Sequence, residues 1–538
     1  MFADPLFDLR RATVLLWHAL RLCVALLIPR RTGGGQRFEV LVRKFLQDLG
    51  MTGLKMGQFL ALRSDLLPPE VCRELGKLFE DATPMDFSSV RFVIESDLGE
   101  SLENLFSDFQ TVPIAAASIA QVHEARSRDG ERVAVKVQRP NLERTFNADM
   151  RNLRRLATVI DALGILGELS LVGVGDEFAK YTRRELDFLT EGRTADRLRA
   201  SVLSQEIVPR IFWALSTRRV LTMEFVGGVS LGKATTLLAA GRGQELFQTL
   251  PDLSLSKATH NLAFAFLHQL FVTGFFQADP HPGNILLCPG NRVAFLDFGI
   301  FGEVSPMQKE ALARYIEEVS MGKSDEGVRY YARVYTPSDR TDLDAFRREA
   351  KLVLNGWYES SKASGSPFRQ RMLAKFSDEM LGVVRHHHLK ISMDTLLFWR
   401  ALIVLDATLL QLWDGFDLLS ELREFFAEYR PGIIDRTIEI LAPDRRLGTL
   451  VQLISNSAGR VDEVLSGLVS GRFELSVMVK ESPQQRRHEN RRLGAIILSL
   501  VGISVLALTR ISTDATVRKL IWSAALICLA VSLGRLRK

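Results

Sequence analysis

The sequence is poor in cysteine and contains no internal repeats or long low-complexity tracts. Four cysteines occur in 538 residues, and no two of them are closely spaced. This scarcity excludes a disulfide-stapled secreted scaffold and a cysteine-based zinc site, and it is typical of a reducing compartment. Strong charge of one sign is also lacking: the net charge of +6 is small for this length, so we expect no nucleic-acid partner. The length and the 47% hydrophobic content suffice for about two to four structural units.

We expect no cleavable signal peptide. The apolar stretch at residues 13–28 contains His18 and Arg21, and Pro29-Arg30-Arg31 follows it in place of a small-residue cleavage site. The stretch is too short and too interrupted for a membrane span. We expect an amphipathic helix packed on the main domain, and a helix lying on a membrane surface is the alternative.

A dense group of polar residues lies between Gly274 and Gly299. Asn284 follows Asp279 by five residues, and Asp297, within an Asp-Phe-Gly sequence, follows Asn284 by thirteen. Protein kinases carry an Asp, an Asn and an Asp-Phe-Gly in this order. Because Mg²⁺ prefers oxygen ligands, Asn284 and Asp297 are the predicted metal ligands. Asp279 is then the predicted catalytic group beside the transferred phosphoryl group, and a hairpin with polar ends is the structural alternative.

An upstream lysine completes this kinase-like pattern. Residues 121–125 and 132–137 predict two strands joined by a turn at Gly130, and the Val-Ala-Val-Lys sequence that ends at Lys136 resembles the kinase strand whose lysine contacts ATP. The expected glycine-rich loop is missing, and alanine cannot copy it because positive φ is costly for alanine. Backbone N–H groups and one hydroxyl of the corresponding run remain candidates for facing the nucleotide. The run consists of Ala115, Ala116, Ala117 and Ser118.

Together these motifs resemble the UbiB family of atypical kinase-like proteins, the bacterial relatives of the coenzyme Q kinases. The resemblance is close over residues 53–302. Two positions depart from the family pattern: Gln277 stands where the family usually has His, and Gly192 where it commonly has Ala. Neither position holds a metal or phosphate ligand. The matching segments are KMGQFLALRSDLLPPE (55–70), PIAAASIAQVHEA (113–125), VAVKVQRP (133–140), ELDFLTE (185–191), QADPHPGN (277–284) and LDFG (296–299).

The resemblance implies a nucleotide site that uses Mg²⁺ with ATP or ADP. Lys136 is implied to contact the α and β phosphates. Glu185 and Glu191 are both candidates for its acidic partner, with ordinary salt bridges as the alternative for either. Glu185 and Asp187 match the Glu-x-Asp motif of the family.

The resemblance also implies a regulatory lid. Lys55 and Gln58, three residues apart on one face of a predicted helix, match a family segment that lies over the cleft where a protein kinase accepts its substrate. Such a lid argues against ordinary protein phosphorylation. Asp187 is assigned to the same lid region.

Further elements follow from local patterns. Residues 220–231 predict a strand and a glycine turn that connect two lobes, with the backbone of Glu224 and Val226 at the adenine edge. Residues 38–63, 231–276 and 306–430 predict helices, and Pro69 predicts the start of another helix.

Two features of the large helical region need an interpretation. Three adjacent histidines, His386 to His388, point in different directions on a helix, so we expect no shared metal ion. Residues 396–412 are strongly apolar, but Arg400 and Asp406 interrupt them, which favours a buried helix over a membrane span.

The C-terminal region carries two uncharged apolar segments, residues 493–509 and 520–534. We predict a two-helix membrane hairpin, with a buried helical hairpin as the alternative. Basic residues are more numerous outside the pair than between its members, so both ends are expected to face the cytoplasm.

The predicted fold class is α+β: a two-lobed protein-kinase-like fold with an N-terminal helical extension and a C-terminal transmembrane hairpin. The predicted segments are a helical extension (1–90), a kinase-like N-lobe (91–230), a kinase-like C-lobe (231–440), an amphipathic linker (441–490) and a membrane anchor (491–538).

The predicted function is that of a membrane-anchored ATPase of the kinase type. By resemblance, it acts in ubiquinone biosynthesis at the inner membrane of a bacterium and makes quinone precursors accessible, with membrane lipids and other quinone-biosynthesis enzymes as partners. A true kinase of a lipid or protein and a non-catalytic nucleotide-binding scaffold are the alternatives. The complete set of Lys136, Asp279, Asn284 and Asp297 argues against the scaffold.

Overall fold

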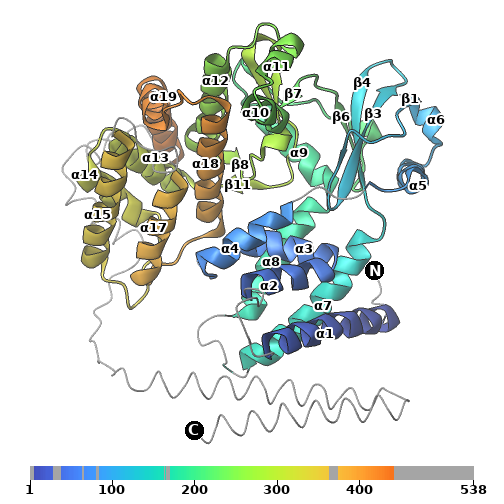
Figure 1. Cartoon of the computed structure of the whole chain (residues 1–538), viewed down its shortest axis with the longest axis horizontal. Helices are drawn as coiled ribbons and strands as arrows, with labels where there is room; N and C mark the ends of the chain where they lie inside the picture. The colour runs from blue at the N-terminus through green and yellow to red at the C-terminus, as the bar shows by residue number, and fades with distance from the viewer. Residues whose placement is uncertain are drawn as a thin grey trace, which may run out of the picture. The chain divides into compact units, whose positions relative to one another are not determined.

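The computed structural model in Figure 1 describes residues 5–27, 38–63, 66–79, 84–162, 164, 170–362 and 373–441. Nearly all of these residues belong to one compact unit, formed by residues 1–158 and 171–452. A second unit comprises residues 159–170 and 453–538. The predicted linker (441–490) lies outside the described residues except for its first position, and the predicted membrane hairpin lies wholly outside them. Both stay predictions, as do the segment boundaries.

The N-terminal extension is mostly helical in its described ranges. Its elements are α1 (Pro5–Leu27), α2 (Phe38–Asp48), α3 (Met51–Ala61), α4 (Pro69–Leu75) and the short helix η1 (Gly76–Phe79). The prediction of one helix over residues 38–63 is wrong, because Gly50 has a φ of +76° and separates α2 from α3. A positive φ of this kind interrupts a helix, and glycine adopts it at little cost.

Helix α1 is attached to α7 (Leu142–Ala162) by two partly buried ion pairs, as expected for a packed helix. Arg11 pairs with Asp149 at 2.7 Å, and Arg151 pairs with Asp8 at 2.6 Å. The opposite side of α1 exposes apolar side chains, including Leu6 (79% exposed) and Trp17 (61%). Packing therefore accounts for one face of α1, and the membrane-surface alternative stays untested.

A five-stranded antiparallel sheet forms the smaller lobe, with the order β1-β3-β4-β6 and β2 paired on β3. Both predicted strands are present, as β3 (Ala120–Ser127) and β4 (Arg132–Gln138), and the turn between them uses Gly130 with a φ of +82°. Alternate valines of β4 pack under α5, while Lys136 points to the other face. The remaining elements are α5 (Phe87–Leu98), α6 (Leu102–Leu105), β1 (Phe106–Phe109), β2 (Ala115–Ala116) and β6 (Val220–Glu224).

Two helices and two smaller sheets follow this lobe. Helices α8 (Leu171–Glu185) and α9 (Phe188–Arg199) carry the acidic motif, and a four-stranded sheet has the order β5-β10-β9-β7. A two-stranded sheet, β8 with β11, flanks the Asp-Phe-Gly sequence. Their bounds are β5 (Glu206–Ile207), η2 (Trp213–Leu215), β7 (Val229–Ser230), β8 (Phe275–Gln277), η4 (Pro282–Asn284), β9 (Ile285–Cys288), η5 (Pro289–Asn291), β10 (Arg292–Phe295) and β11 (Phe301–Glu303).

The larger lobe is helical, as the sequence predicts. Helix α13 shows why its start lies where it does: Pro306 occupies the first turn, and the side chains of Ser305 and Gln308 form a reciprocal capping box. The helices are α10 (Leu231–Ala239), α11 (Gly243–Thr249), α12 (Leu255–Leu267), η3 (His268–Thr273), α13 (Pro306–Ser320), α14 (Ser324–Arg333), α15 (Leu343–Lys362), α17 (Leu373–His386), α18 (Met393–Leu412) and α19 (Leu418–Leu441).

Helix α18 is the one helix in the described part of the chain that is long and apolar enough to cross a membrane. The apolar window of this helix is 72% buried within the structure, and Phe398, Leu402 and Leu409 belong to the main hydrophobic core. The prediction of a buried helix is confirmed. Its two charged interruptions have separate partners, which are described below.

Candidate functional site

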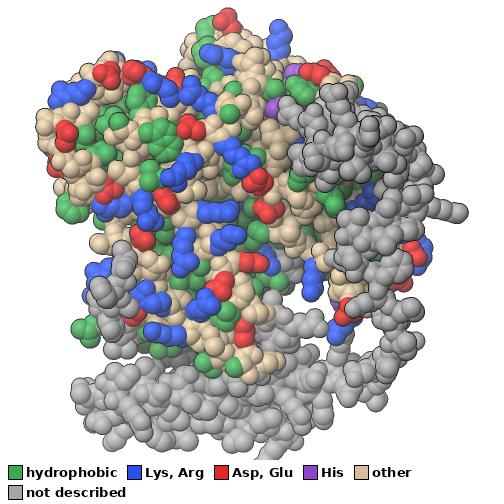
Figure 2. Space-filling model, turned by 180° about the vertical axis from the view of Figure 1, so that it is seen from behind, with side chains coloured by type: hydrophobic (Ala, Val, Ile, Leu, Met, Phe, Trp, Pro, Cys, Tyr) green, Lys and Arg blue, Asp and Glu red, His purple; other side chains and the backbone are tan. Residues whose placement is uncertain are grey.

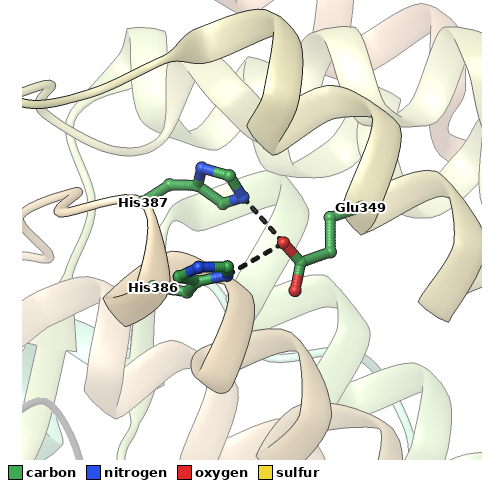
Figure 3. Close-up of side chains that lie close together, drawn as sticks. All are labelled: Glu349, His386 and His387. Atoms are coloured by element: carbon green, nitrogen blue, oxygen red, sulfur yellow. Dashed lines mark hydrogen bonds and ion pairs between the residues drawn. The ribbon is translucent and has the colours of Figure 1, made fainter.

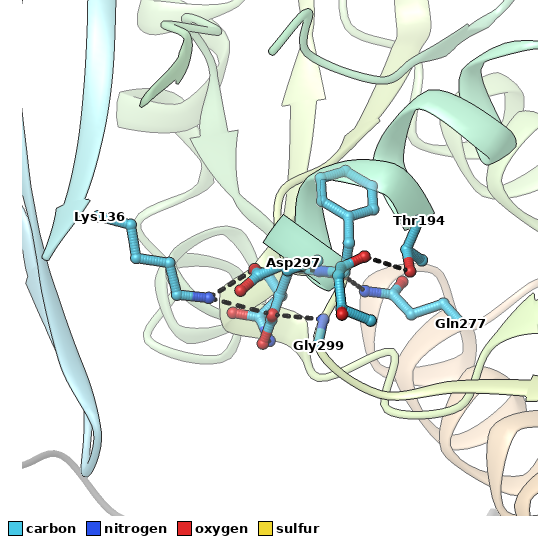
Figure 4. A network of polar contacts seen from close by, with 9 residues as sticks. Lys136, Thr194, Gln277, Asp297 and Gly299 are labelled. Atoms are coloured by element: carbon cyan, nitrogen blue, oxygen red, sulfur yellow. Dashed lines mark hydrogen bonds and ion pairs between the residues drawn. The ribbon is translucent and has the colours of Figure 1, made fainter. Parts of the chain in front are cut away.

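Three charged side chains from different elements meet at the base of the sheet lobe (Figure 4). Lys136 on β4 reaches Glu191 on α9, with Nζ 2.6 Å from Oε1, and Asp297, with Nζ 3.4 Å from Oδ1. Glu191 is almost completely buried, at 1% exposure of its side chain. Of the two acidic candidates that the sequence leaves open, Glu191 is therefore the one paired with Lys136.

The charges of this group depend on one another. Burial alone would lower the pKa of Lys136, but the charges of Asp297 and Glu191 outweigh it and raise that pKa above its ordinary value. Burial raises the pKa of Glu191 to about 7, although Lys136 opposes this. Burial also acts against the charge of Asp297, yet Lys136, the Gly299 N–H and Lys55 hold its pKa below the ordinary value. Because one lysine cannot fully neutralise two carboxylates, the pKa of Asp297 is lowered while the pKa of Glu191 is raised.

Asp297 is fixed by its neighbours on several sides. The Asn284 amide nitrogen donates to Oδ2 at 3.3 Å, and the Gly299 N–H donates to Oδ1 at 3.1 Å. The Gln277 side chain donates to the backbone carbonyl of Asp297 at 2.7 Å, as Figure 4 shows. Gln277 thus braces the Asp-Phe-Gly segment without needing to titrate. Asn284 and Asp297, which the sequence predicts as metal ligands, lie side by side.

Asp279 has a cationic partner that the sequence analysis did not assign to the site. Arg400 of α18 pairs with Asp279, with 2.9 Å between Nη2 and Oδ1. The two side chains are 23% and 16% exposed. An arginine inside an otherwise apolar, buried helix was the available signal, since such a charge needs a partner. The pairing holds Asp279 two residues beyond the end of β8.

Lys55 and Glu185 form a second buried pair in place of the solvated lysine that a surface helix would carry. Their Nζ and Oε2 atoms are 2.8 Å apart, and the side chains are only 9% and 5% exposed. Gln58 donates to the carbonyl of Leu78 at 3.2 Å, which ties α3 to η1. The predicted lid residues thus join α3 to α8. Asp187 caps the start of α9 by accepting from the Leu189 N–H at 3.1 Å.

The alanine-rich run differs in part from expectation. Ala115 and Ala116 pair with β3 as a short strand, and the Ala117 N–H donates to the Ala120 carbonyl at 2.7 Å. The expectation that these N–H groups face a nucleotide is therefore wrong for Ala117, because its N–H already has an acceptor. Ser118, which follows the strand, is half-buried.

The predicted connector between the lobes follows β6. Backbone N–H groups of Glu224 and Phe225 donate to the carbonyls of Arg210 and Arg132, at 2.8 and 3.1 Å. Within the described ranges, no hydrogen bond uses the N–H of Val226. Of the positions predicted at the adenine edge, Val226 is the one whose donor remains available.

The family comparison agrees with this geometry. Residues 77–330 match the model of the ABC1 atypical kinase-like domain. This chain carries an ABC1 atypical kinase-like domain. Its relatives include proteins named ACTIVITY OF BC1 COMPLEX KINASE, which agrees with the resemblance to the UbiB family that the motifs predict.

Three relatives show the extent of the similarity. The uncharacterized protein sll1770 of Synechocystis sp. is 32% identical over 343 residues, covering 63% of this chain and 56% of that protein. ACTIVITY OF BC1 COMPLEX KINASE 7, chloroplastic, of Arabidopsis thaliana is 29% identical over 475 residues, covering 86% and 66%. ACTIVITY OF BC1 COMPLEX KINASE 8, chloroplastic, of the same plant is 28% identical over 513 residues, covering 87% and 66%. The chain thus spans between 56% and 66% of the length of these relatives.

Among solved structures, the Rv3197–erythromycin complex from Mycobacterium tuberculosis aligns with 23% identity. The alignment covers 72% of this chain and 94% of that chain, with a TM-score of 0.49.

The departure at Gly192 in this ABC1 chain has a local explanation. A Cβ at Gly192 would lie 2.9 Å from the Trp213 ring and 3.2 Å from a methyl group of Leu221. These two side chains fill the space that an alanine would use. The glycine at this position therefore accompanies close packing against Trp213 and Leu221 and alters none of the charged side chains.

Proposed function

We propose that this chain binds Mg²⁺ and ATP beside Lys136 and Asp297, hydrolyses the nucleotide, and so supports ubiquinone biosynthesis at a bacterial inner membrane. The observation that supports the nucleotide chemistry is the ion-paired group of Lys136, Glu191 and Asp297. The quinone pathway rests on the resemblance to the UbiB family. In this proposal the cleft faces the cytoplasm, and hydrolysis makes membrane quinone precursors accessible to other enzymes of the pathway.

The donor set of the site suits Mg²⁺. Asp297 supplies carboxylate oxygens, and its lowered pKa keeps them ionised at neutral pH. Asn284 turns its amide nitrogen toward Asp297, so rotation about its Cβ–Cγ bond would direct the amide oxygen to the same point. These are the hard oxygen ligands that Mg²⁺ takes in phosphoryl-transfer sites. Bound there, the ion would neutralise charge on the phosphates.

The other side chains then have distinct roles in hydrolysis. Lys136 would contact the α and β phosphates while Glu191 keeps its ammonium oriented. Asp279, held by Arg400, would orient the attacking water as the catalytic group. The N–H of Val226 would bind the adenine edge, as the corresponding backbone does in kinase-like folds.

A true kinase of a lipid or a protein is the second candidate, and the printed names of the Arabidopsis relatives favour it. The same catalytic groups serve either reaction. The buried Lys55–Glu185 pair anchors α3, and it does so close enough to the site for the charge of Lys55 to lower the pKa of Asp297. A helix held at this place leaves little room for a bulky protein acceptor. A small lipid acceptor is not disfavoured in this way.

The test is phosphate release from Mg²⁺–ATP by the purified full chain. The assay is run with and without vesicles that carry a phenol resembling a quinone precursor. We expect release that rises with the phenol and falls to background in Asp297→Asn. Asp339→Asn, which changes an exposed carboxylate in the helical lobe, is the matched control and should retain activity.

Each outcome discriminates between the candidates. Release of inorganic phosphate that depends on Asp297 supports the ATPase, whereas phosphate incorporated into the phenol or a protein supports a kinase. Nucleotide binding without either product would contradict the proposal and favour a scaffold that uses nucleotide only to set its conformation.

A further inference from the structure

Two adjacent histidines and a glutamate from a neighbouring helix converge at the end of α17 (Figure 3). The His386 Nδ1 atom lies 3.0 Å from Glu349 Oε2, and the His387 Nε2 atom lies 2.8 Å from the same oxygen. Glu349 belongs to α15, so the contact joins two helices of the larger lobe. The group is outside the nucleotide site, and the proposed hydrolysis gives it no role.

The histidine group lies where helix α17 ends. Helix α17 ends at His386, and His388 takes a left-handed conformation with a φ of +55°. The Leu389 N–H bonds the Val384 carbonyl, and the His388 N–H bonds the Arg385 carbonyl, which is the Schellman pattern of helix ends. His386 and His387 offer different ring nitrogens, Nδ1 and Nε2, and these reach the same oxygen although the side chains leave the backbone in different directions.

We propose that His386, His387 and Glu349 bind one divalent transition-metal ion of the zinc type. Two imidazoles with one carboxylate are ligands that Zn²⁺ accepts, and water can fill the remaining position because His386 is 69% exposed. Imidazole nitrogen favours zinc-like ions over Mg²⁺ and Ca²⁺, which prefer oxygen.

The two nitrogen–oxygen distances are somewhat shorter than those of a bound site, and all three ligand atoms lie within 4.8 Å of one another. Ligand atoms about 2.1 Å from a tetrahedral ion lie roughly 3.4 Å from one another. The two nitrogen–oxygen distances of 3.0 and 2.8 Å would therefore open by roughly half an ångström on binding. Glu349, 39% exposed, and His386 have room for such a change, whereas His387 is 11% exposed and packs edge-on against Phe346. The less mobile His387 ring provides a fixed point for the ion.

One other group of three such side chains occurs in the described part of the chain, formed by His260, Glu421 and Glu424. It offers a single imidazole, since its other two members are carboxylates. Its His260 ring also stacks on Phe264, with 4.2 Å between centroids. The two-histidine group is therefore the better ligand set for a zinc-type ion, and the His260 group provides an internal comparison.

The experiment measures Zn²⁺ binding to the full chain in detergent, purified without a polyhistidine tag and freed of metal with a chelator. Millimolar Mg²⁺ is kept present to occupy oxygen-only sites. We expect one Zn²⁺ per chain, and a visible absorption band when Co²⁺ replaces Zn²⁺. His386→Ala, His387→Ala and Glu349→Gln should each weaken binding by about tenfold or more, since even outer-shell changes at metal sites cost this much.

Two control variants make the result specific. His388→Ala alters the third histidine of the run, and His260→Ala alters the other candidate group; both should bind Zn²⁺ like the parent chain. Thermal unfolding without metal checks that each variant is folded, and the exposed His386→Ala is the one least able to disturb packing. Absence of tight Zn²⁺ binding, or equal affinity in all variants, would overturn the proposal and leave the group as a hydrogen-bonded helix contact. Loss of binding only in His260→Ala would assign the ion to the other group.

Discussion

At the scale of residues, two lysines with little solvent exposure pair with different acidic side chains around the candidate site. Lys136 forms ion pairs with Glu191 and Asp297, and Lys55 forms an ion pair with Glu185. Glu185 and Glu191 are six residues apart and chemically alike, yet a change of helix, from α8 to α9, gives them different partners. A buried charge without its partner is strongly destabilising, so each pair has a measurable signature.

Removal of Lys55 is expected to destabilise the fold. Lys55→Met leaves Glu185 buried and unpaired, which should lower the free energy of unfolding by about 3–5 kcal/mol in chemical denaturation. The double variant Lys55→Met/Glu185→Leu should recover most of this loss. Lys77→Met breaks an ion pair whose lysine is 61% exposed, and it should cost less than about 1 kcal/mol. Equal effects of Lys55→Met and Lys77→Met would contradict the buried pairing.

Asp406 is expected to make stability depend on pH. Burial on α18 raises its pKa to about 7, although a hydrogen bond from the Leu373 N–H opposes this. The folded chain then binds more protons than the unfolded chain between about pH 4 and pH 7, so this group's contribution to stability is lost as pH rises through that window. This rise in the pKa of Asp406 means that ionising its carboxyl group costs roughly 4 kcal/mol more in the folded chain than in the unfolded chain.

Asp406→Asn keeps an acceptor for Leu373 and removes the charge. The variant should unfold at a higher temperature than the parent chain at pH 8, with little difference at pH 4. The measurement is thermal unfolding across this pH range, with the exposed Asp414→Asn as the control. If the unfolding temperatures of the parent chain and Asp406→Asn changed in parallel with pH, ionisation of Asp406 would not destabilise the folded chain, which would contradict the prediction.

At the scale of elements, close helix contacts in the N-terminal extension depend on glycine. A Cβ on Gly53 of α3 would collide with the backbone carbonyl oxygen of Leu46 on α2, and backbone cannot move aside as a side chain can. Gly50, with its positive φ, provides the break in the backbone that lets α3 fold back against α2. The close contact between α2 and α3 determines the position of α3, and α3 carries Lys55 and Gln58. The backbone of these two helices therefore positions the predicted lid.

Gly53→Ala tests this contact. Although alanine favours helix by about 1 kcal/mol, overpacking costs about 1–3 kcal/mol, and an immobile backbone partner puts the cost at the upper end. We expect a net loss of about 1–2 kcal/mol in the free energy of unfolding. Gly76→Ala is the control, because Gly76 has a helical φ of −56° and no atom within 4 Å of a built Cβ. It should be neutral or stabilise slightly, and destabilisation of the same size in both variants would contradict the steric argument.

At the scale of the whole molecule, charge and apolar surface bear on where the protein works. The face in Figure 2 shows basic and acidic side chains interspersed, which accords with a net charge of only +6. The described part of this face therefore lacks the uniformly positive electrostatic potential that attracts nucleic acid. Within the described ranges, the one helix apolar enough to span a bilayer is the mostly buried α18. Membrane attachment through the C-terminal region therefore stays a prediction from sequence.

Deletion of residues 493–538 is expected to release the protein from membranes. The deleted segments are the uncharged apolar runs predicted to form the hairpin, and the nucleotide-site residues lie far from them in the sequence. Fractionation should move the truncated chain to the soluble fraction, while nucleotide binding is retained. A folded truncated chain that stays with the membrane would instead implicate α1, whose Leu6 and Trp17 are exposed.

The catalytic motif and the strand pattern were predictable because they depend on local spacing. The Asp279, Asn284 and Asp297 series, the β3–β4 pair around Gly130 and the buried character of α18 follow from order, alternation and interrupted apolar runs. The break at Gly50 was not predicted, because an isolated glycine in a helical pattern is ambiguous until the packing of its flanks is known. The prediction that the three histidines share no metal ion rested on helical directions alone, and that reasoning omitted the partner helix.

The sequence by itself determined the family, the order of the catalytic residues and the strand that carries Lys136, since these are properties of neighbouring positions. Only the tertiary structure decided which acidic side chain each lysine pairs with. It also brought Arg400 to Asp279, 121 residues away in the sequence, and Glu349 to the two histidines. The physical reason is that a buried charge or polar group must find its partner in space, and the partner's distance along the chain does not constrain that choice.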